Sequence, residues 1–242
     1  MSIDISITII FISLIQSIFG TGVLLFGTPI LLILGYDFKS LLIILLPISI
    51  SINIMQIKDG LENIDVKFYK GLIIYCLPSV FIALYLIDFN SKELNLFVGL
   101  FLTMISLKSN IKVVGKLLVF LFRNETIYLI LMGLLHGITN LGGALLSGGI
   151  LIKESSKDVK RATIAICYLS MAFIQIFTLV FKFNSNTFIA SFNPIYLITA
   201  LAIYITSQRF LYDKISDHLF VKISDIFLFM MGFTLVGQYL LN

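Results

Sequence analysis

Hydrophobic residues lie in long runs that short polar and charged stretches separate. Eight such runs are present, at residues 5–34, 41–57, 68–87, 94–107, 126–152, 162–181, 187–207 and 226–241. A helix that crosses the hydrocarbon core of a bilayer needs about 20 mainly apolar residues. The pattern therefore predicts an all-α polytopic membrane protein. The basic, partly apolar stretch 108–123 is expected to be an interfacial helix instead of a ninth span.

The composition indicates that lipid is the surrounding solvent. Of the 242 residues, 59% are hydrophobic and 12% are charged, which is more apolar surface than one soluble core buries. The net charge is +4, but the basic residues are scattered through short loops and read as topology signals, not as a nucleic-acid patch. The first apolar run lacks the basic flank and cleavage site of a signal peptide, so we expect it to remain in the protein.

The second half of the sequence repeats the first after a shift of 121 residues. The shift pairs identical residues without a gap: Gly22 with Gly143, Leu24 with Leu145, Leu25 with Leu146, Gly27 with Gly148, Lys39 with Lys160, Ile43 with Ile164 and Ser49 with Ser170. We therefore expect an internal duplication with four hydrophobic segments in each half. Residues 1–121 form the first transmembrane repeat and residues 122–242 the second.

The first and fifth segments share an unusual length and an interruption. Each is close to 30 residues long, and glycines interrupt it near its middle, at residues 19–22 and 139–143. A straight helix of that length would overshoot the hydrocarbon layer by roughly 10 to 15 Å. Each half is thus predicted to begin with a broken or re-entrant segment, which three crossings follow.

The distribution of Lys and Arg favours this arrangement. If all eight segments cross once, the two sides of the membrane hold eight and nine basic residues. If the fifth segment enters and returns, the division is fourteen against three, with only Lys39, Lys92 and Lys182 outside. That is a clear positive-inside bias. With an odd number of crossings per half, the halves would be inverted repeats, a common plan of secondary transporters, and both termini would lie outside.

The two breaks also carry the candidate binding residues. A half-helix that begins inside the membrane directs its free N–H groups and its positive dipole end at whatever lies there. Two such helices, beginning near Gly22 and Gly143, would form an anion site without a fixed cationic side chain. The candidate substrate-binding residues are Gly20, Thr21, Gly22, Thr139, Asn140, Gly142, Gly143 and Ser147. The alternative for the hydroxyl groups is a bond to their own backbone or to a neighbouring helix.

His136 is an ionisable residue well inside an apolar run. Intramembrane ionisable groups are functional candidates by default, so His136 is a candidate for proton coupling, in which its imidazolium pairs with the anion or carries a proton. The alternative is a neutral imidazole that bonds to a facing helix. In later segments Asn53, Gln56 and Gln175 would either line a path or join helices by hydrogen bonds.

The breaks and the sequences after them resemble a known family. The first copy covers residues 20–36 and contains Pro29, and the second covers residues 137–163 and has Ile150 at the place of the proline. This pattern resembles the sulfite exporter TauE/SafE family of membrane transporters. The resemblance implies a secondary transporter in the bacterial plasma (inner) membrane that moves a small sulfur oxyanion, such as sulfite or a sulfonate, or a related organic anion.

A transmembrane thiol–disulfide electron carrier is the main alternative, and it would use Cys76 and Cys167. The shift of 121 residues places Cys76 opposite Leu197, however, so the two thiols are not equivalent in the repeat. Two Cys whose Cα atoms are more than about 7 Å apart do not form a disulfide without backbone movement.

Other classes of function find less support. A rhomboid-like intramembrane protease would need Ser147 activated by His136, yet Leu145 stands where its motif has glycine. A passive scaffold would leave the paired glycine breaks without a purpose. The spacing of His and Cys gives no metal site, and we expect no enzyme activity and no cofactor. The expected partners are a small anion, lipid, and a coupling proton or cation.

Overall fold

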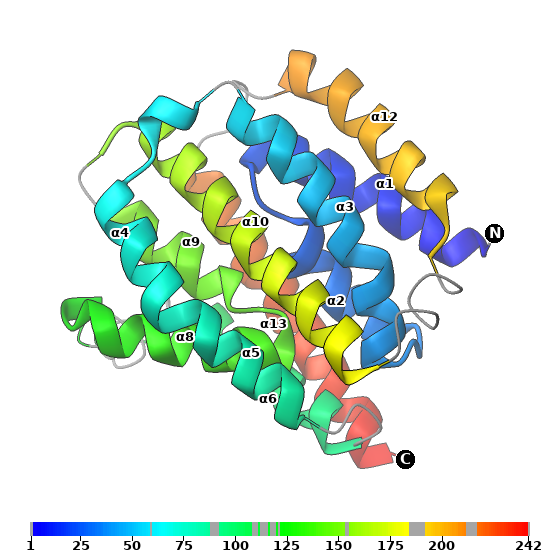
Figure 1. Cartoon of the computed structure of the whole chain (residues 1–242). Coiled ribbons are helices and arrows are strands. Elements are labelled where there is room, and N and C mark those ends of the chain that lie inside the picture. Colours follow the sequence, from blue (N-terminus) through cyan, green and yellow to red (C-terminus); the bar gives the residue numbers. More distant parts are fainter. Residues whose placement is uncertain are drawn as a thin grey trace.

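The structure is a computed structural model of the chain, and it describes residues 2–58, 60–87, 92–107, 122–152, 155–183, 192–211 and 217–241, with residues 111, 116 and 120. Over these ranges it contains helices and no strand (Figure 1). The helices are α1 (Ile3–Phe19), α2 (Val23–Ile33), α3 (Phe38–Lys58), η1 (Leu61–Asn63), α4 (Val66–Gly71), η2 (Leu72–Cys76), α5 (Leu77–Leu86), α6 (Lys92–Ser106), α8 (Glu125–Thr139), α9 (Gly143–Ile152), α10 (Lys157–Lys182), α12 (Pro194–Leu211) and α13 (Asp217–Leu241). The all-α prediction is confirmed, and most of the interfacial helix expected at 108–123 lies outside the described residues.

Three helical stretches in the described part of the chain are long and apolar enough to cross a bilayer. They are Phe38–Lys58, Val66–Leu86 and Asp158–Lys182. Shorter apolar helices of 10–17 residues accompany them. The first and fifth hydrophobic segments are each divided into two such short helices, α1 with α2 and α8 with α9, at the glycine-rich positions where a break was predicted.

The stretch from Val66 to Leu86 is one continuous helix with a widened turn before Pro78. The Leu77 N–H bonds to the Leu72 carbonyl, five residues earlier, instead of to a carbonyl four residues earlier. Proline has no N–H to offer the regular ladder, and a single wide turn accommodates the interruption without breaking the helix. The widened turn packs against α8, where the missing side chain of Gly133 leaves room for the Cys76 carbonyl.

The principal helix pairs join the first half of the chain to the second. Helix α3 packs on α10, α6 on α13, α1 on α12, and α5 on α8 (Figure 1). Where α6 and α13 cross, a Cβ atom on Gly232 would lie 2.7 Å from the Gly99 carbonyl oxygen, so only glycine permits this approach. Small residues at crossings are typical of membrane helices, because van der Waals packing replaces the hydrophobic effect there.

Helices α3 and α10 are antiparallel neighbours. At one end, near the start of α3, Lys39 Nζ lies 4.0 Å from the centre of the Phe183 ring, just after the end of α10. At the other end, the Asp65 N–H beyond α3 donates to the Thr163 hydroxyl near the start of α10, at 2.8 Å. The two long helices therefore run in opposite directions through the centre of the molecule.

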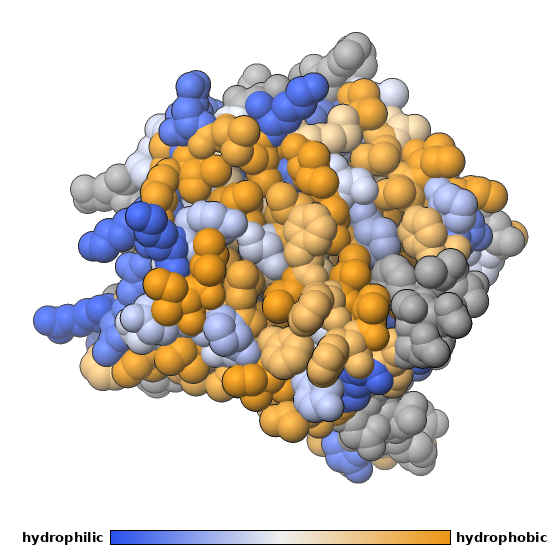
Figure 2. All heavy atoms as spheres, in the orientation of Figure 1, coloured by the Kyte–Doolittle hydropathy of each residue, from blue (hydrophilic) through white to orange (hydrophobic). Residues whose placement is uncertain are grey.

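The outer surface is largely apolar, whereas many polar side chains are buried. Leu86, Phe181 and Phe233 are each at least 66% exposed, and Figure 2 shows a broad hydrophobic face with hydrophilic residues mainly at the left, where α4 and α8 begin. In contrast, His136 and Gln175 are fully buried. Exposed apolar side chains on the outside, with some buried polar side chains inside, are what a lipid-facing helical bundle with a polar site in its interior requires.

Candidate functional site

The two helix breaks have the same backbone turn. The residue that follows α1, Gly20, has a φ of 71°, and the residue that follows α8, Asn140, has a φ of 60°, both in the left-handed region. In each break the N–H of this residue bonds to the carbonyl four residues earlier, Gln16 at 2.9 Å and His136 at 2.8 Å. The next helix then turns back against the one before it, since α2 packs on α1 and α9 on α8. Each break is thus the tip of a helical hairpin.

Asn140 connects the second hairpin to the rest of the interior. Among the described residues it is the non-glycine residue with a positive φ, a conformation that Asn tolerates better than most side chains. Its amide nitrogen donates to the Thr28 hydroxyl on α2 at 2.9 Å. Its amide oxygen accepts from Gln175 Nε2 on α10 at 3.1 Å. One side chain therefore links both hairpins and the long central helix.

His136 extends this chain of hydrogen bonds. Its Nε2 lies 3.2 Å from Gln175 Oε1. Because the Gln175 amide nitrogen is directed at Asn140, its oxygen accepts from His136, which assigns the proton of the neutral imidazole to Nε2. The other ring nitrogen, Nδ1, is buried and has no hydrogen-bond partner among the described residues. His136 thus has a position at which a second proton would bind.

The first break is closed by side-chain amides of its own half. Gln16 Oε1 accepts from the Val23 N–H at the start of α2, at 3.0 Å. Gln16 Nε2 donates to the Gly20 carbonyl at 3.0 Å and to Gln56 Oε1 at 2.8 Å, and Gln56 Nε2 also donates to the Gly20 carbonyl, at 3.1 Å. The first N–H group of α2 is therefore already capped, unlike the open helix start that the sequence predicted.

Tyr168 of α10 touches both breaks at once. Thr21 in the first break donates to the Tyr168 hydroxyl at 3.0 Å. The same hydroxyl lies against Gly143, where any Cβ atom would overlap it. Reasoning from the sequence missed Tyr168, because it stands in an apolar run and the repeat places Pro47 opposite it. A spacing signal exists, since Arg161, Tyr168 and Gln175 recur every seven residues.

Of the other candidate binding residues, three have contacts that account for them structurally, and one has an unused hydroxyl. Thr139 donates to the Leu135 carbonyl at 2.7 Å and accepts from the Leu141 N–H at 3.1 Å, the backbone-bonded alternative for a membrane hydroxyl. Gly22 caps the start of α2, and Gly142 packs so closely on His136 that a Cβ atom would lie 2.5 Å from the His136 Cβ. Ser147 is buried on α9, and its hydroxyl has no hydrogen-bond partner among the described residues.

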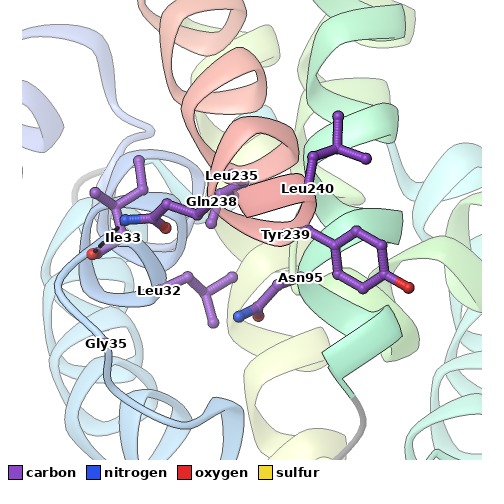
Figure 3. Close-up of a pocket in the computed structure, with 8 residues that line it drawn as sticks. All are labelled: Leu32, Ile33, Gly35, Asn95, Leu235, Gln238, Tyr239 and Leu240. Carbon is purple, nitrogen blue, oxygen red and sulfur yellow. Dashed lines mark hydrogen bonds between the residues drawn. The ribbon is translucent and has the colours of Figure 1, made fainter. Parts of the chain in front are cut away.

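The cysteines and a surface cavity lie apart from this network. Cys76 Sγ lies 4.0 Å from the thioether sulfur of Met171, and Cys167 is also buried. A cavity of about 800 Å³ opens between the far ends of α2, α6 and α13 (Figure 3). Its lining residues are Leu32, Ile33, Gly35, Asn95, Leu235, Gln238, Tyr239 and Leu240. None of the predicted site residues lines this cavity. Leu32, which does, stands near the end of α2, whereas the first break lies at the start of that helix.

A model of the family described as sulfite exporter TauE/SafE matches residues 5–235, nearly the whole chain. The chain belongs to the sulfite exporter TauE/SafE family. No curated protein and no solved structure matches it. Membership in TauE/SafE confirms the resemblance that the glycine-rich breaks indicated, and makes this chain a multi-pass membrane transporter of the sulfur-anion exporter class.

Replacing Asn140 separates the role of its backbone from that of its amide. Asn140→Gly keeps the left-handed turn but removes both amide hydrogen bonds, so we expect the free energy of unfolding to fall by about 1–3 kcal/mol. Asn140→Ala should be less stable than Asn140→Gly by about another 1 kcal/mol, because Ala resists a positive φ. Thermal unfolding of the purified variants in detergent measures both steps. Equal stability of the two variants would contradict the strained turn.

Proposed function

We propose that this TauE/SafE protein is a secondary transporter that moves a small sulfur oxyanion, such as sulfite or a sulfonate, or a related organic anion across the bacterial inner membrane. The observation that supports this most directly is that two helices, α2 and α9, begin at buried breaks and pack against each other. The site residues proposed for the anion are Gly20, Thr21, Gly22, Thr139, Asn140, Gly142, Gly143 and Ser147.

A helix start in the interior favours an anion for two physical reasons. Its first N–H groups have no partner within the helix, and the helix dipole places about half a positive charge there. In surroundings of low dielectric constant both effects act more strongly than in water. Because positions 142 and 143 are glycine, the side chains of His136 and Tyr168 lie directly against the start of α9, beside the anion proposed there.

The proposed inverted repeat rests on how the halves pack. Helices α3 and α10 hold corresponding places in the two halves and run antiparallel. The hairpin helix α1 packs on α12 of the second half, and α8 packs on α5 of the first half. Such an exchange of partners is what a pseudo-twofold axis in the membrane plane would produce. In this arrangement Lys39 and Lys182 lie outside and both termini do as well.

His136 is proposed to couple transport to protons. Its buried Nδ1 has no described hydrogen-bond partner, and the chain from His136 through Gln175 reaches Asn140 in the break. Protonation at Nδ1 would add a positive charge beside the proposed anion site, so proton and anion would bind cooperatively.

The inverted arrangement predicts that Lys39 and Lys160 face opposite sides of the membrane, although they are equivalent in the repeat. Single cysteines at these positions, in a chain with Cys76→Ala and Cys167→Ala, can be probed with an impermeant maleimide. Lys39→Cys should label in intact cells, and Lys160→Cys only after the membrane is opened. A cysteine at Lys58 is the inner control. Labelling of positions 39 and 160 from the same side would rule out inverted halves.

Anion transport itself is tested by flux of labelled sulfite, sulfonates and carboxylates into proteoliposomes. Gly143→Leu should reduce saturable flux at least about a hundredfold, because the side chain displaces the Tyr168 hydroxyl from the start of α9 together with any ligand there, and removing oriented contacts to a charge is worth several kcal/mol. Gly148→Leu on the same helix is the matched control, since a Cβ atom there meets nothing within 4 Å. Absence of flux in the wild type, or equal flux in both variants, would contradict the proposal.

Proton coupling predicts a different phenotype for His136→Gln. The amide keeps a hydrogen-bonding group beside Gln175 but does not titrate. We expect an imposed pH gradient to stimulate wild-type flux and to leave the flux of the variant at the rate measured without the gradient. The measurement is initial flux with and without the gradient at the same anion concentration. A variant that responds to the gradient like the wild type would exclude His136 as the coupling residue.

A further inference from the structure

Three polar residues form a stripe along the face of α10 that meets the breaks. Arg161, Tyr168 and Gln175 follow one another at intervals of seven residues, which is nearly two helical turns, so they lie above one another on one face. The other polar residues of α10 in the membrane are Thr163, Ser170 and Thr178, whose hydroxyls take part in hydrogen bonds to the backbone. A charged and two polar groups on this face need a reason beyond helix packing.

Each member of the stripe contacts a different part of the two breaks. The Arg161 side chain packs on the first break, where its Cγ and Nε lie 3.3 and 3.5 Å from the position a Cβ atom would take on Gly20. Tyr168 contacts Thr21 and Gly143 in the middle. Gln175 bonds to Asn140 in the second break. The stripe therefore follows the line along which the two hairpins meet.

The hydroxyl of Tyr168 is placed to donate to a ligand. It accepts the hydrogen bond from Thr21, which leaves its own proton for a further acceptor. Ser147 stands on α9 one helical turn after Gly143, and it is more than nine-tenths buried without a hydrogen-bond partner among the described residues. Three hydroxyl groups and the start of α9 thus gather at Gly143.

We propose that the α10 stripe lines the anion's path and that Tyr168 is its specificity-determining residue. Arg161 supplies positive charge at the inner side, and the anion then binds at the start of α9, where the Tyr168 and Ser147 hydroxyls and the first N–H groups of α9 donate to its oxygens, while Thr21 orients Tyr168 by donating to its hydroxyl. This inference rests on the proposed transport function. It makes the two breaks unequal, because Gln16 of the first hairpin caps the Val23 N–H of α2, whereas Tyr168 from a separate helix lies against the start of α9.

Two hydroxyl donors, Tyr168 and Ser147, together with the first N–H groups of α9 match an anion with three oxygens on one centre. Sulfite and sulfonates present three such oxygens in a pyramid, whereas a carboxylate presents two in a plane. Removing one donor should therefore weaken the binding of sulfur oxyanions more than the binding of a carboxylate of similar size. Loss of packing alone would weaken both alike, so the ratio of the two KM values separates a binding role from a structural one.

The experiment compares Tyr168→Phe with Tyr128→Phe in proteoliposomes. Tyr128 is a buried control whose hydroxyl donates to the Leu145 carbonyl within α9 and lies beside Gly149 instead of Gly143. Tyr168→Phe should raise the KM for sulfite or a sulfonate about tenfold, the loss expected for one hydrogen bond to a charged group, and should raise the carboxylate KM less. Tyr128→Phe should leave both KM values near those of the wild type.

Arg161 is tested in the same assay by charge rescue. Arg161→Gln should raise the KM about tenfold or more and Arg161→Lys should recover most of the affinity, because long-range attraction needs charge and not the guanidinium shape. If the wild type transports and Tyr168→Phe has an unchanged KM, or raises both anions' KM equally, the role of Tyr168 is overturned. If Arg161→Lys is no better than Arg161→Gln, the charge role is overturned. Absence of wild-type flux would instead refute the proposed transport function.

Discussion

The two helix breaks lie in the hydrophobic interior, where the backbone groups at the end of one helix and the start of the next must form hydrogen bonds without water. The rest of the interior is arranged around that constraint. An unpaired N–H or C=O costs several kcal/mol in hydrocarbon. Gln16 and Gln56 bond to the Gly20 carbonyl and the Val23 N–H in the first break. In the second break the Asn140 backbone forms the left-handed turn, and its side-chain amide donates to Thr28 and accepts from Gln175. The buried polar side chains are therefore the substitute for water at the breaks.

The same backbone turn supports different chemistry in the two hairpins. Both turns depend on one residue in the left-handed region, glycine in one and asparagine in the other. In the first, an amide from the same hairpin caps the following helix, which makes that break a closed structural unit. In the second, the neighbouring group is Tyr168 from another helix. A tyrosine on a separate helix is free to exchange its partner for a ligand, whereas an amide that holds its own hairpin is not.

The sequence was sufficient for the features that depend on local chain properties. The length of the first and fifth runs together with their glycines predicted both breaks to within a residue or two, and hydropathy predicted the all-α membrane protein. The contacts of Tyr168 were not predictable in the same way, because Thr21 and Gly143 lie 147 and 25 residues away along the chain. Nor did the sequence reveal that Gln16 caps α2, since capping at a distance of seven residues follows from the turn itself.

The packing of α10 explains how the two breaks can act together. Helix α10 contacts α3 along its length and also packs against α5 and α9, so it touches both halves of the molecule. Arg161 of α10 contacts the first break, and Gln175 contacts the second. Tyr168, between them, contacts both breaks. A shift of α10 that frees one break therefore alters the contacts of the other, because a packed helix moves as a rigid element. Under the proposed function, this coupling is what alternating access to a single central anion site requires.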